Sequence, residues 1–157
     1  MHDEVVIVEA VRTPVGRFNG ALSSLSAPKL GGAAIREVIR RSSIDAALVE
    51  NVIMGHVLSG GAGQAPARQA AILSGIPSSA NAFALNKVCA SGLQSVILAA
   101  QEIQTGEYEV VIAGGMESMS LAPHVLMNSR TGIRMGDAQL VDSMVYDGLW
   151  CPFENRH

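Results

Sequence analysis

Hydrophobic positions along the chain fall into short runs separated by turn-forming residues. Nearly continuous apolar runs predict buried strands at 4–11, 51–55 and 109–113, and the looser alternation at 80–88 predicts a fourth strand. Apolar residues recur at helical spacing between them, which predicts helices at 26–41, 66–74 and 93–103. Alternating strands and helices are typical of an α/β domain, and the order over 81–113 predicts a parallel βαβ unit.

This pattern ends near residue 121. The stretch 121–157 contains two prolines and several glycines, no clear strand, and at most one short helix, at 138–146. Long irregular segments in compact domains are usually functional or incomplete. We therefore interpret 1–120 as an α/β domain and 121–157 as the beginning of an insertion that the chain does not finish.

Cys89 lies at the junction between the strand at 80–88 and the following helix, for which Ser91 is the predicted cap and Gly106 the predicted end. A thiol there meets the unpaired amides and the positive end of the helix dipole, which favour the thiolate. A thiolate attacks carbonyls and thioesters. The alternative is that Cys89 is a buried, inert packing residue, because nothing in the spacing supplies a base.

The carboxyl ends of parallel strands are where sites gather in such sheets. The Cys89 turn and the Gly114-Gly115 turn both follow predicted strands, so we expect them to lie close together. His56 also follows a strand, but an isolated histidine there is more often packed or solvated than catalytic.

Composition narrows the possible partners. Hydrophobic residues make up 48% of the 157 residues and charged residues 16%, so we expect the chain to need a partner, either another copy or a missing part of the same protein. The net charge of −3 gives no reason to expect nucleic acid. The two cysteines lie far apart without a Cys-x-x-Cys motif, which argues against a zinc site and a disulfide framework. Without a membrane-length apolar segment or a signal peptide at 1–4, we expect no membrane partner and a cytoplasmic protein.

Several separated motifs occur in order along the chain: Glu9-Ala10-Val11-Arg12-Thr13-Pro14, Gly63-Gln64, Pro66-Ala67-Arg68-Gln69-Ala70, Val88-Cys89-Ala90-Ser91-Gly92, Gly114-Gly115-Met116-Glu117-Ser118-Met119-Ser120, Met135-Gly136-Asp137 and Asp147-Gly148-Leu149. Together they closely resemble the amino-terminal part of the thiolases, the acetyl-CoA acetyltransferase and 3-ketoacyl-CoA thiolase family. Departures are small: Ala65 stands where the family commonly has asparagine, and Cys151 where an acidic residue is frequent.

The resemblance implies a thiolase-like half-fold, with a mixed sheet, a buried helix and the start of an inserted loop domain. It also implies that Cys89 accepts an acyl group from acyl-CoA. A second acetyl-CoA then attacks in a Claisen condensation, or a 3-ketoacyl-CoA is cleaved by thiolysis in reverse. Leu149 and His157 would lie along the pantetheine arm of CoA. Neither a metal nor a cofactor is implied, since CoA thioesters are the substrates.

Thiolases carry a catalytic histidine, a second catalytic cysteine and a water-holding asparagine in the carboxyl-terminal half, outside this sequence. We therefore expect the 157-residue chain alone to be inactive. Alternatives are a non-catalytic half-fold or structural subunit that binds a complementary chain, and a natural two-piece enzyme. The resemblance further implies a homo-oligomer, a dimer or a tetramer, with 125–141 in a region that often mediates tetramer contacts.

Overall fold

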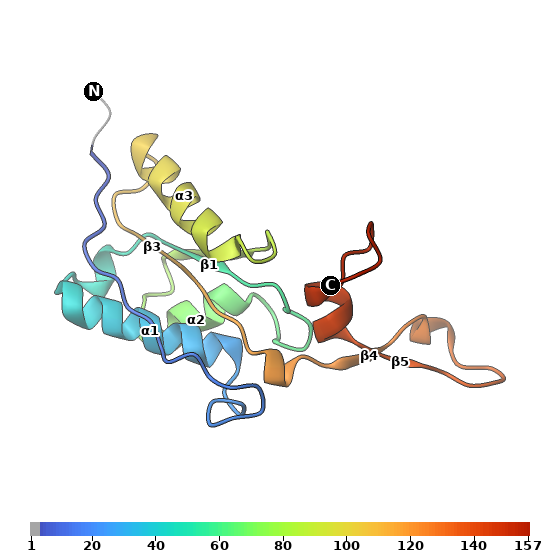
Figure 1. Cartoon of the computed structure of the whole chain (residues 1–157). Coiled ribbons are helices and arrows are strands. Elements are labelled where there is room, and N and C mark those ends of the chain that lie inside the picture. The colour runs from blue at the N-terminus through green and yellow to red at the C-terminus, as the bar shows by residue number, and fades with distance from the viewer. Residues whose placement is uncertain (1–3) are drawn as a thin grey trace.

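The computed structural model describes residues 4–157 and contains a three-stranded parallel sheet (Figure 1). The strands are β1 (Asn51–Gly55), β2 (Asn81–Leu85) and β3 (Val111–Gly115), in the order β2-β1-β3. Asn51 is in register with Asn81 on one side and with Val111 on the other. The central strand β1 is buried along its whole length, as its continuous apolar sequence predicts. The expectation that 1–4 is not the start of a signal peptide concerns mainly residues 1–3, which lie outside the described residues.

Three α-helices cover the two faces of the sheet. Helices α1 (Ala27–Ser42) and α2 (Pro66–Ser74) pack against each other on one face, and α3 (Ser91–Gln104) packs against β1 and β3 on the other (Figure 1). Both α1 and α2 begin with a proline in the first turn, and Gly75 ends α2 in the left-handed conformation. The buried core lies between the sheet and this helix pair and includes Ile35, Val52, Met54, Ala67, Ala70 and Ala71. An α/β architecture is therefore confirmed.

The sheet differs from the expectation in two respects. Its three strands are all parallel, so no mixed sheet is formed by the residues that the structure describes. Strands β2 and β3 run parallel in one sheet and are connected through α3, as a βαβ unit requires, but β1 lies between them, so they do not pair with each other. Gly114 and Gly115 belong to β3, and the turn begins only at Met116.

The predicted strand at 4–11 is absent. These residues run outside the sheet without a strand assignment, and the side chain of Ile7 is 78% exposed (Figure 1). A β-branched run favours extended backbone, but it becomes a strand only when a neighbouring strand pairs with it. No strand of residues 4–157 does so.

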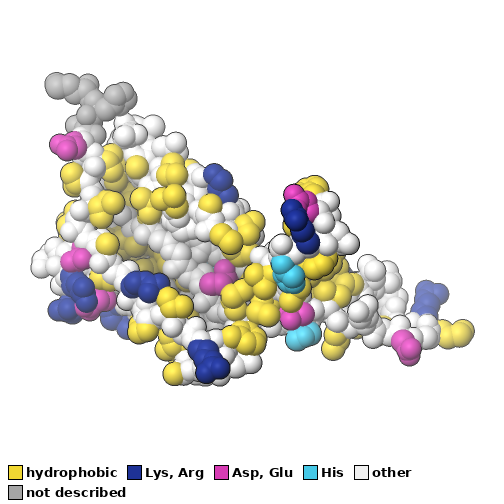
Figure 2. Space-filling view, viewed as in Figure 1, with side chains coloured by type: hydrophobic (Ala, Val, Ile, Leu, Met, Phe, Trp, Pro, Cys, Tyr) yellow, Lys and Arg dark blue, Asp and Glu magenta, His cyan; other side chains and the backbone are white. Residues whose placement is uncertain are grey.

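Within residues 4–157, helix α3 is buried along one side only. Its small residues Ser91, Ser95 and Ala99 face the sheet and are buried. Its large apolar residues point away, and the side chain of Leu93 is 67% exposed. Figure 2 shows hydrophobic side chains gathered on the side of the molecule where α3 and the amino-terminal segment lie. The periodicity therefore predicted the helix correctly but not which side meets the sheet.

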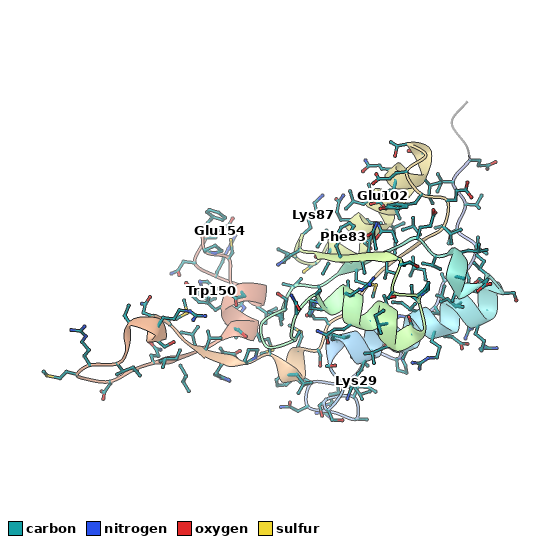
Figure 3. The ribbon with its side chains drawn as sticks, turned by 180° about the vertical axis from the view of Figure 1, so that it is seen from behind. Lys29, Phe83, Lys87, Glu102, Trp150 and Glu154 are labelled. Atoms are coloured by element: carbon teal, nitrogen blue, oxygen red, sulfur yellow. The ribbon has the colours of Figure 1, made fainter. Side chains whose placement is uncertain are left out.

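The carboxyl-terminal residues form an arm that extends from the α/β layers (Figure 1). It contains a 3-10 turn (Met119–Leu121), the antiparallel pair β4 (His124–Leu126) and β5 (Leu140–Asp142), a second 3-10 turn (Ser129–Thr131) and a π-helical stretch (Met144–Leu149). Figure 3 shows Trp150 and Glu154 on this arm, apart from Phe83 and Lys87. The short helix predicted at 138–146 is displaced, because residues 140–142 form β5 and the helical stretch begins only at Met144. Strands of three residues are too short to produce a clear alternation.

Across residues 4–157, none of the helices combines the length and the apolar character that spanning a membrane requires.

Candidate active site around Cys89

Cys89 is exposed on a tight turn between β2 and α3. The preceding residue, Val88, has φ of 51°, a left-handed conformation that is costly for a β-branched side chain. Hydrogen bonds hold this conformation: the amide of Val88 donates to Asn86 Oδ1 at 2.8 Å, and the amide of Lys87 donates to Ser91 Oγ at 2.8 Å. Strained backbone that is held in this way is common at functional sites.

Ser91 has a different role from the predicted helix cap. Helix α3 starts at Ser91 itself, and its N-cap Ala90 has no side-chain capping bond. The buried Ser91 hydroxyl donates to the carbonyl of Val88 at 2.6 Å while accepting the Lys87 amide. The serine therefore closes the turn that presents Cys89, and the first amides of the helix are left without a side-chain acceptor.

The backbone amide of Cys89 donates no hydrogen bond to any group within residues 4–157. An exposed thiol and a free amide on the same residue are suited to acyl transfer. The thiol can attack a carbonyl carbon, and the amide can donate to the oxyanion that forms on the adjacent oxygen.

Glycines allow the Cys89 turn to rest directly on the ends of two strands. A Cβ atom built on Gly55 would lie 2.5 Å from the carbonyl carbon of Ser91, and one on Gly115 would lie 3.4 Å from the Cα of Gly92. Larger side chains would push the helix away from the sheet. The expected proximity of the Cys89 turn and the Gly114-Gly115 segment is therefore confirmed.

A cavity of about 380 Å³ opens beside Cys89. Its lining includes Val57 and Leu58 after β1, Met119 after β3, and Leu149 at the end of the arm. The structure thus places Leu149 in the same cavity as Cys89. His157 does not line this cavity, and its ring instead packs edge-on against Trp150, with 5.2 Å between the ring centroids.

Glu117 and His56 also lie at this site. The sequence alone did not indicate that these two residues form a pair. Glu117 lines the cavity, and its Oε1 atom is 3.3 Å from Nε2 of the buried His56. Burial acts to raise the pKa of Glu117, but the imidazole of His56 at 3.3 Å and hydrogen bonds from the amides of Val57 and Leu58 outweigh it and lower that pKa below its usual range. His56 is packed, as expected. The pair was missed because its partners lie about 60 residues apart in sequence.

Within the part of the chain that the structure describes, no group of three or more histidine, cysteine, aspartate or glutamate side chains is arranged to hold a metal ion.

Comparison with known proteins identifies the family. Residues 5–157 match the model of the thiolase N-terminal domain. The chain is 54% identical to an acetyl-CoA acetyltransferase of Pseudomonas aeruginosa over 154 residues, which cover 98% of this chain and 39% of that protein. It is 53% identical to an acetyl-CoA acetyltransferase of Cupriavidus necator, with the same coverage. It is 54% identical to acetyl-CoA acetyltransferase 2 of Arabidopsis thaliana over 94% of this chain and 36% of that protein.

The chain thus spans about two fifths of the length of the curated relatives that it matches. The match to the family model extends through both the α/β layers and the arm, and it includes the Cys89 turn. The chain belongs to the thiolase family, and its residues 5–157 match the N-terminal domain of that family.

Proposed function

We propose that Cys89 is the acyl-accepting nucleophile of a thiolase-type acyl-CoA C-acyltransferase. The observation that carries this proposal is the turn at Cys89, where an exposed thiol, a free backbone amide and an apolar cavity meet at the start of a helix. Membership of the thiolase family and identity to acetyl-CoA acetyltransferases support the same reaction class. Acetyl-CoA is the proposed substrate for this reason.

The proposed reaction has two steps. The thiolate of Cys89 attacks the carbonyl carbon of acyl-CoA, a new bond from Sγ to carbon forms, and the bond to CoA sulfur breaks as CoA leaves and takes a proton. The α-carbon of a second acetyl-CoA, after losing a proton, then attacks the acyl-enzyme. A carbon–carbon bond forms, and Cys89 leaves as thiolate. The reverse direction is thiolysis of a 3-ketoacyl-CoA.

Within this chain, each site residue has a defined part in the proposed reaction. The Cys89 amide donates a hydrogen bond to the oxyanion that develops on the thioester oxygen, where charge appears only in the transition state. Leu149 contacts the pantetheine arm from the cavity wall. His157 would reach the same arm only after the end of the chain moves, because its ring now packs on Trp150.

The remaining catalytic groups are expected outside this chain. By family resemblance, the catalytic histidine, the second cysteine and the water-holding asparagine come from the carboxyl-terminal half. Groups that act as a unit in catalysis fail together when one is removed. The isolated chain is therefore expected to show no steady-state thiolysis of acetoacetyl-CoA, and a sustained rate from the pure chain would contradict this expectation.

The test joins the chain to the carboxyl-terminal region of the Pseudomonas aeruginosa relative and exposes the protein briefly to acetyl-CoA. Denaturing intact-mass spectrometry and peptide mapping should find one acetyl group on Cys89. The variant Cys89→Ser should carry no adduct, whereas Cys151→Ser should be acetylated like the parent. A folded parent whose Cys89 stays unacetylated would refute the proposal, and it would favour a structural subunit that only binds a complementary chain.

A homo-oligomer, a tetramer in particular, is also proposed. The β4–β5 hairpin spans the region 125–141 that resembles the tetramer contact of the family, and the side chain of Met135 near its tip is 95% exposed. An apolar tip on a projecting hairpin is suited to contact with another copy. Light scattering of the completed protein should give the mass of four chains, and Met135→Glu should lower it.

A further inference from the structure

The carboxylate of Glu117 connects the ends of two strands at the wall of the Cys89 cavity. Its Oε2 atom accepts the amide of Val57 at 2.9 Å, and Oε1 accepts the amide of Leu58 at 3.1 Å. Glu117 follows β3, whereas Val57 and Leu58 follow β1. One side chain therefore holds two consecutive amides of a segment that has left the sheet and has no strand partner.

His56, the residue before Val57, is held through both its backbone and its side chain. The amide of His56 donates to the carbonyl of Leu85 at the end of β2, at 3.0 Å. Its imidazole is almost completely buried, with 1% of the side chain exposed, and Nε2 faces Glu117 Oε1 at 3.3 Å. His56 thus links β1 to β2 through its backbone, and its ring faces Glu117, the second residue after β3.

The segment held in this way forms part of the cavity over Cys89. Val57 and Leu58 both line the cavity, and so does Glu117. Leu58 also meets the arm: a Cβ atom built on Gly148 would lie 3.1 Å from Cδ2 of Leu58, and the next residue, Leu149, completes that wall. Displacement of Leu58 would therefore move both the strand-end wall and its contact with the arm.

Glu117 is not accounted for by the acyl-transfer steps, and a half-buried carboxylate would be an expensive choice if only packing were needed. A charged acceptor gives shorter and stronger hydrogen bonds to amides than a neutral group does, and this one carboxylate accepts from both amides while it lies 3.3 Å from the imidazole of His56. These features are those of a group that fixes a segment in one position.

We propose that Glu117 is a positioning residue of the Cys89 site. Paired with His56, it holds Val57 and Leu58 as the wall against which the acyl-CoA thioester is aligned with the thiol. This inference rests on the proposed acyl transfer at Cys89. Misplacement of a reacting group by about 1 Å can cost on the order of a hundredfold in rate. Loss of the Glu117 contacts should therefore slow acyl transfer while the thiol itself stays intact.

The experiment uses the chain completed with the carboxyl-terminal region of the Pseudomonas aeruginosa relative, as parent, Glu117→Gln and Glu107→Gln. Glu107 is exposed and has no side-chain partner among residues 4–157, so its variant removes the same charge without the contacts. Single-turnover acetylation of Cys89 at saturating acetyl-CoA is measured beside alkylation of Cys89 by iodoacetamide, which needs no aligned substrate.

Glu117→Gln should lower the saturated acetylation rate roughly tenfold or more, because Gln offers one acceptor oxygen in place of two. Alkylation should keep the parent rate in both variants, and acetylation should keep it in Glu107→Gln. Acetylation at the parent rate in Glu117→Gln would overturn the proposal. An equal fall in acetylation and alkylation would also overturn it, since it would indicate general damage to the fold.

Two further measurements keep the proposal testable. If Glu117→Gln does not fold, Glu117→Asp replaces it, because this variant keeps the charge but shortens the side chain. It should lower the acetylation rate, to a smaller extent, without lowering the alkylation rate. An unaltered acetylation rate would overturn the proposal. If the parent is not acetylated, the proposed function fails by itself. Amide hydrogen exchange then decides the positioning role: faster exchange at Val57 and Leu58 in Glu117→Gln supports it, and unaltered exchange refutes it.

Discussion

Gly55 and Ser91 are so close that a Cβ atom on the glycine would lie 2.5 Å from the carbonyl carbon of the serine. The last residue of β1 therefore supports the first turn of α3, and with it the turn that presents Cys89. Because Ser91 contributes backbone at this contact, it cannot yield by rotating a side chain. The placement of the nucleophile thus depends on the absence of one methyl group in the sheet.

Gly55→Ala should therefore move α3 or destabilise the fold. Overpacking of this kind costs about 1–3 kcal/mol, and urea unfolding should detect it. Gly60→Ala is the matched control, because a Cβ there meets nothing nearer than 3.8 Å and the backbone has no positive φ. A Gly55→Ala protein as stable as the control, with unaltered iodoacetamide reactivity at Cys89, would contradict the close contact.

Ser91→Ala should loosen the Cys89 turn. The substitution removes both the acceptor of the Lys87 amide and the donor to the Val88 carbonyl, in a residue that is 4% exposed. Leaving such groups unsatisfied costs about 1–3 kcal/mol. Val88 should then relax from its left-handed conformation, and the nuclear magnetic resonance shifts of Val88 and Cys89 should change. Ser79→Ala, at an exposed serine without a side-chain hydrogen bond among residues 4–157, should alter neither stability nor these shifts.

The elements that the sequence predicts well are those whose signals are local. Residues 66–74 form α2 with the expected bounds because a proline in the first turn and Gly75 after the last mark them. β1 is also recovered, because a central strand is apolar on both faces. The strand expected at 4–11 fails because pairing depends on a neighbour, which local sequence does not encode.

At the candidate site too, the sequence predicts features that depend on local signals and does not predict contacts between distant residues. The sequence predicts Cys89 from its place before a helix, and the structure shows that this cysteine is exposed rather than buried as packing. The contacts of Glu117 join residues about 60 positions apart in sequence. The close approach of Gly55 and Gly115 to the start of α3 depends on the order of the strands in the sheet. Such features need the folded chain, because no periodicity or motif spacing specifies them.

The Glu117 carboxylate should make stability depend on pH in a defined direction. Its pKa is lowered in the folded chain, so its contribution is fully present above the ordinary glutamate pKa of about 4.3 and is lost as the pH falls through the lower folded value. Glu117→Gln should therefore be less stable than the parent near pH 7 by about 1–3 kcal/mol, the cost of leaving buried amides poorly paired.

This difference should shrink as the pH falls below the ordinary glutamate pKa of about 4.3, because the carboxylate becomes protonated in the unfolded parent first and in the folded parent only at lower pH. Urea unfolding of both proteins from pH 7 to pH 3.5 measures it, with Glu107→Gln as the control that should follow the parent throughout. A constant difference between parent and Glu117→Gln over this range would show that the charge of Glu117 does not contribute to stability.

The outward side of α3 should bind hydrophobic dyes in the isolated chain. Leu93, Val96 and Ile97 form an apolar surface there, with Leu93 67% exposed. Soluble monomers rarely leave contiguous apolar patches uncovered. Anilinonaphthalene sulfonate fluorescence should therefore be strong for the chain alone. It should fall in a Leu93→Lys, Ile97→Lys variant, while Met135→Lys on the hairpin tip should have a smaller effect because it leaves the α3 surface unaltered.

Joining the chain to the carboxyl-terminal region of its Pseudomonas aeruginosa relative should suppress the same fluorescence, since we expect that region to cover α3. The double lysine variant should then be poorly soluble or fail to assemble when joined, because two charges would be buried without partners. Equal dye binding by the chain alone and by the joined protein would show that the α3 surface stays exposed. The carboxyl-terminal region would then have to reach the Cys89 site through a surface other than α3.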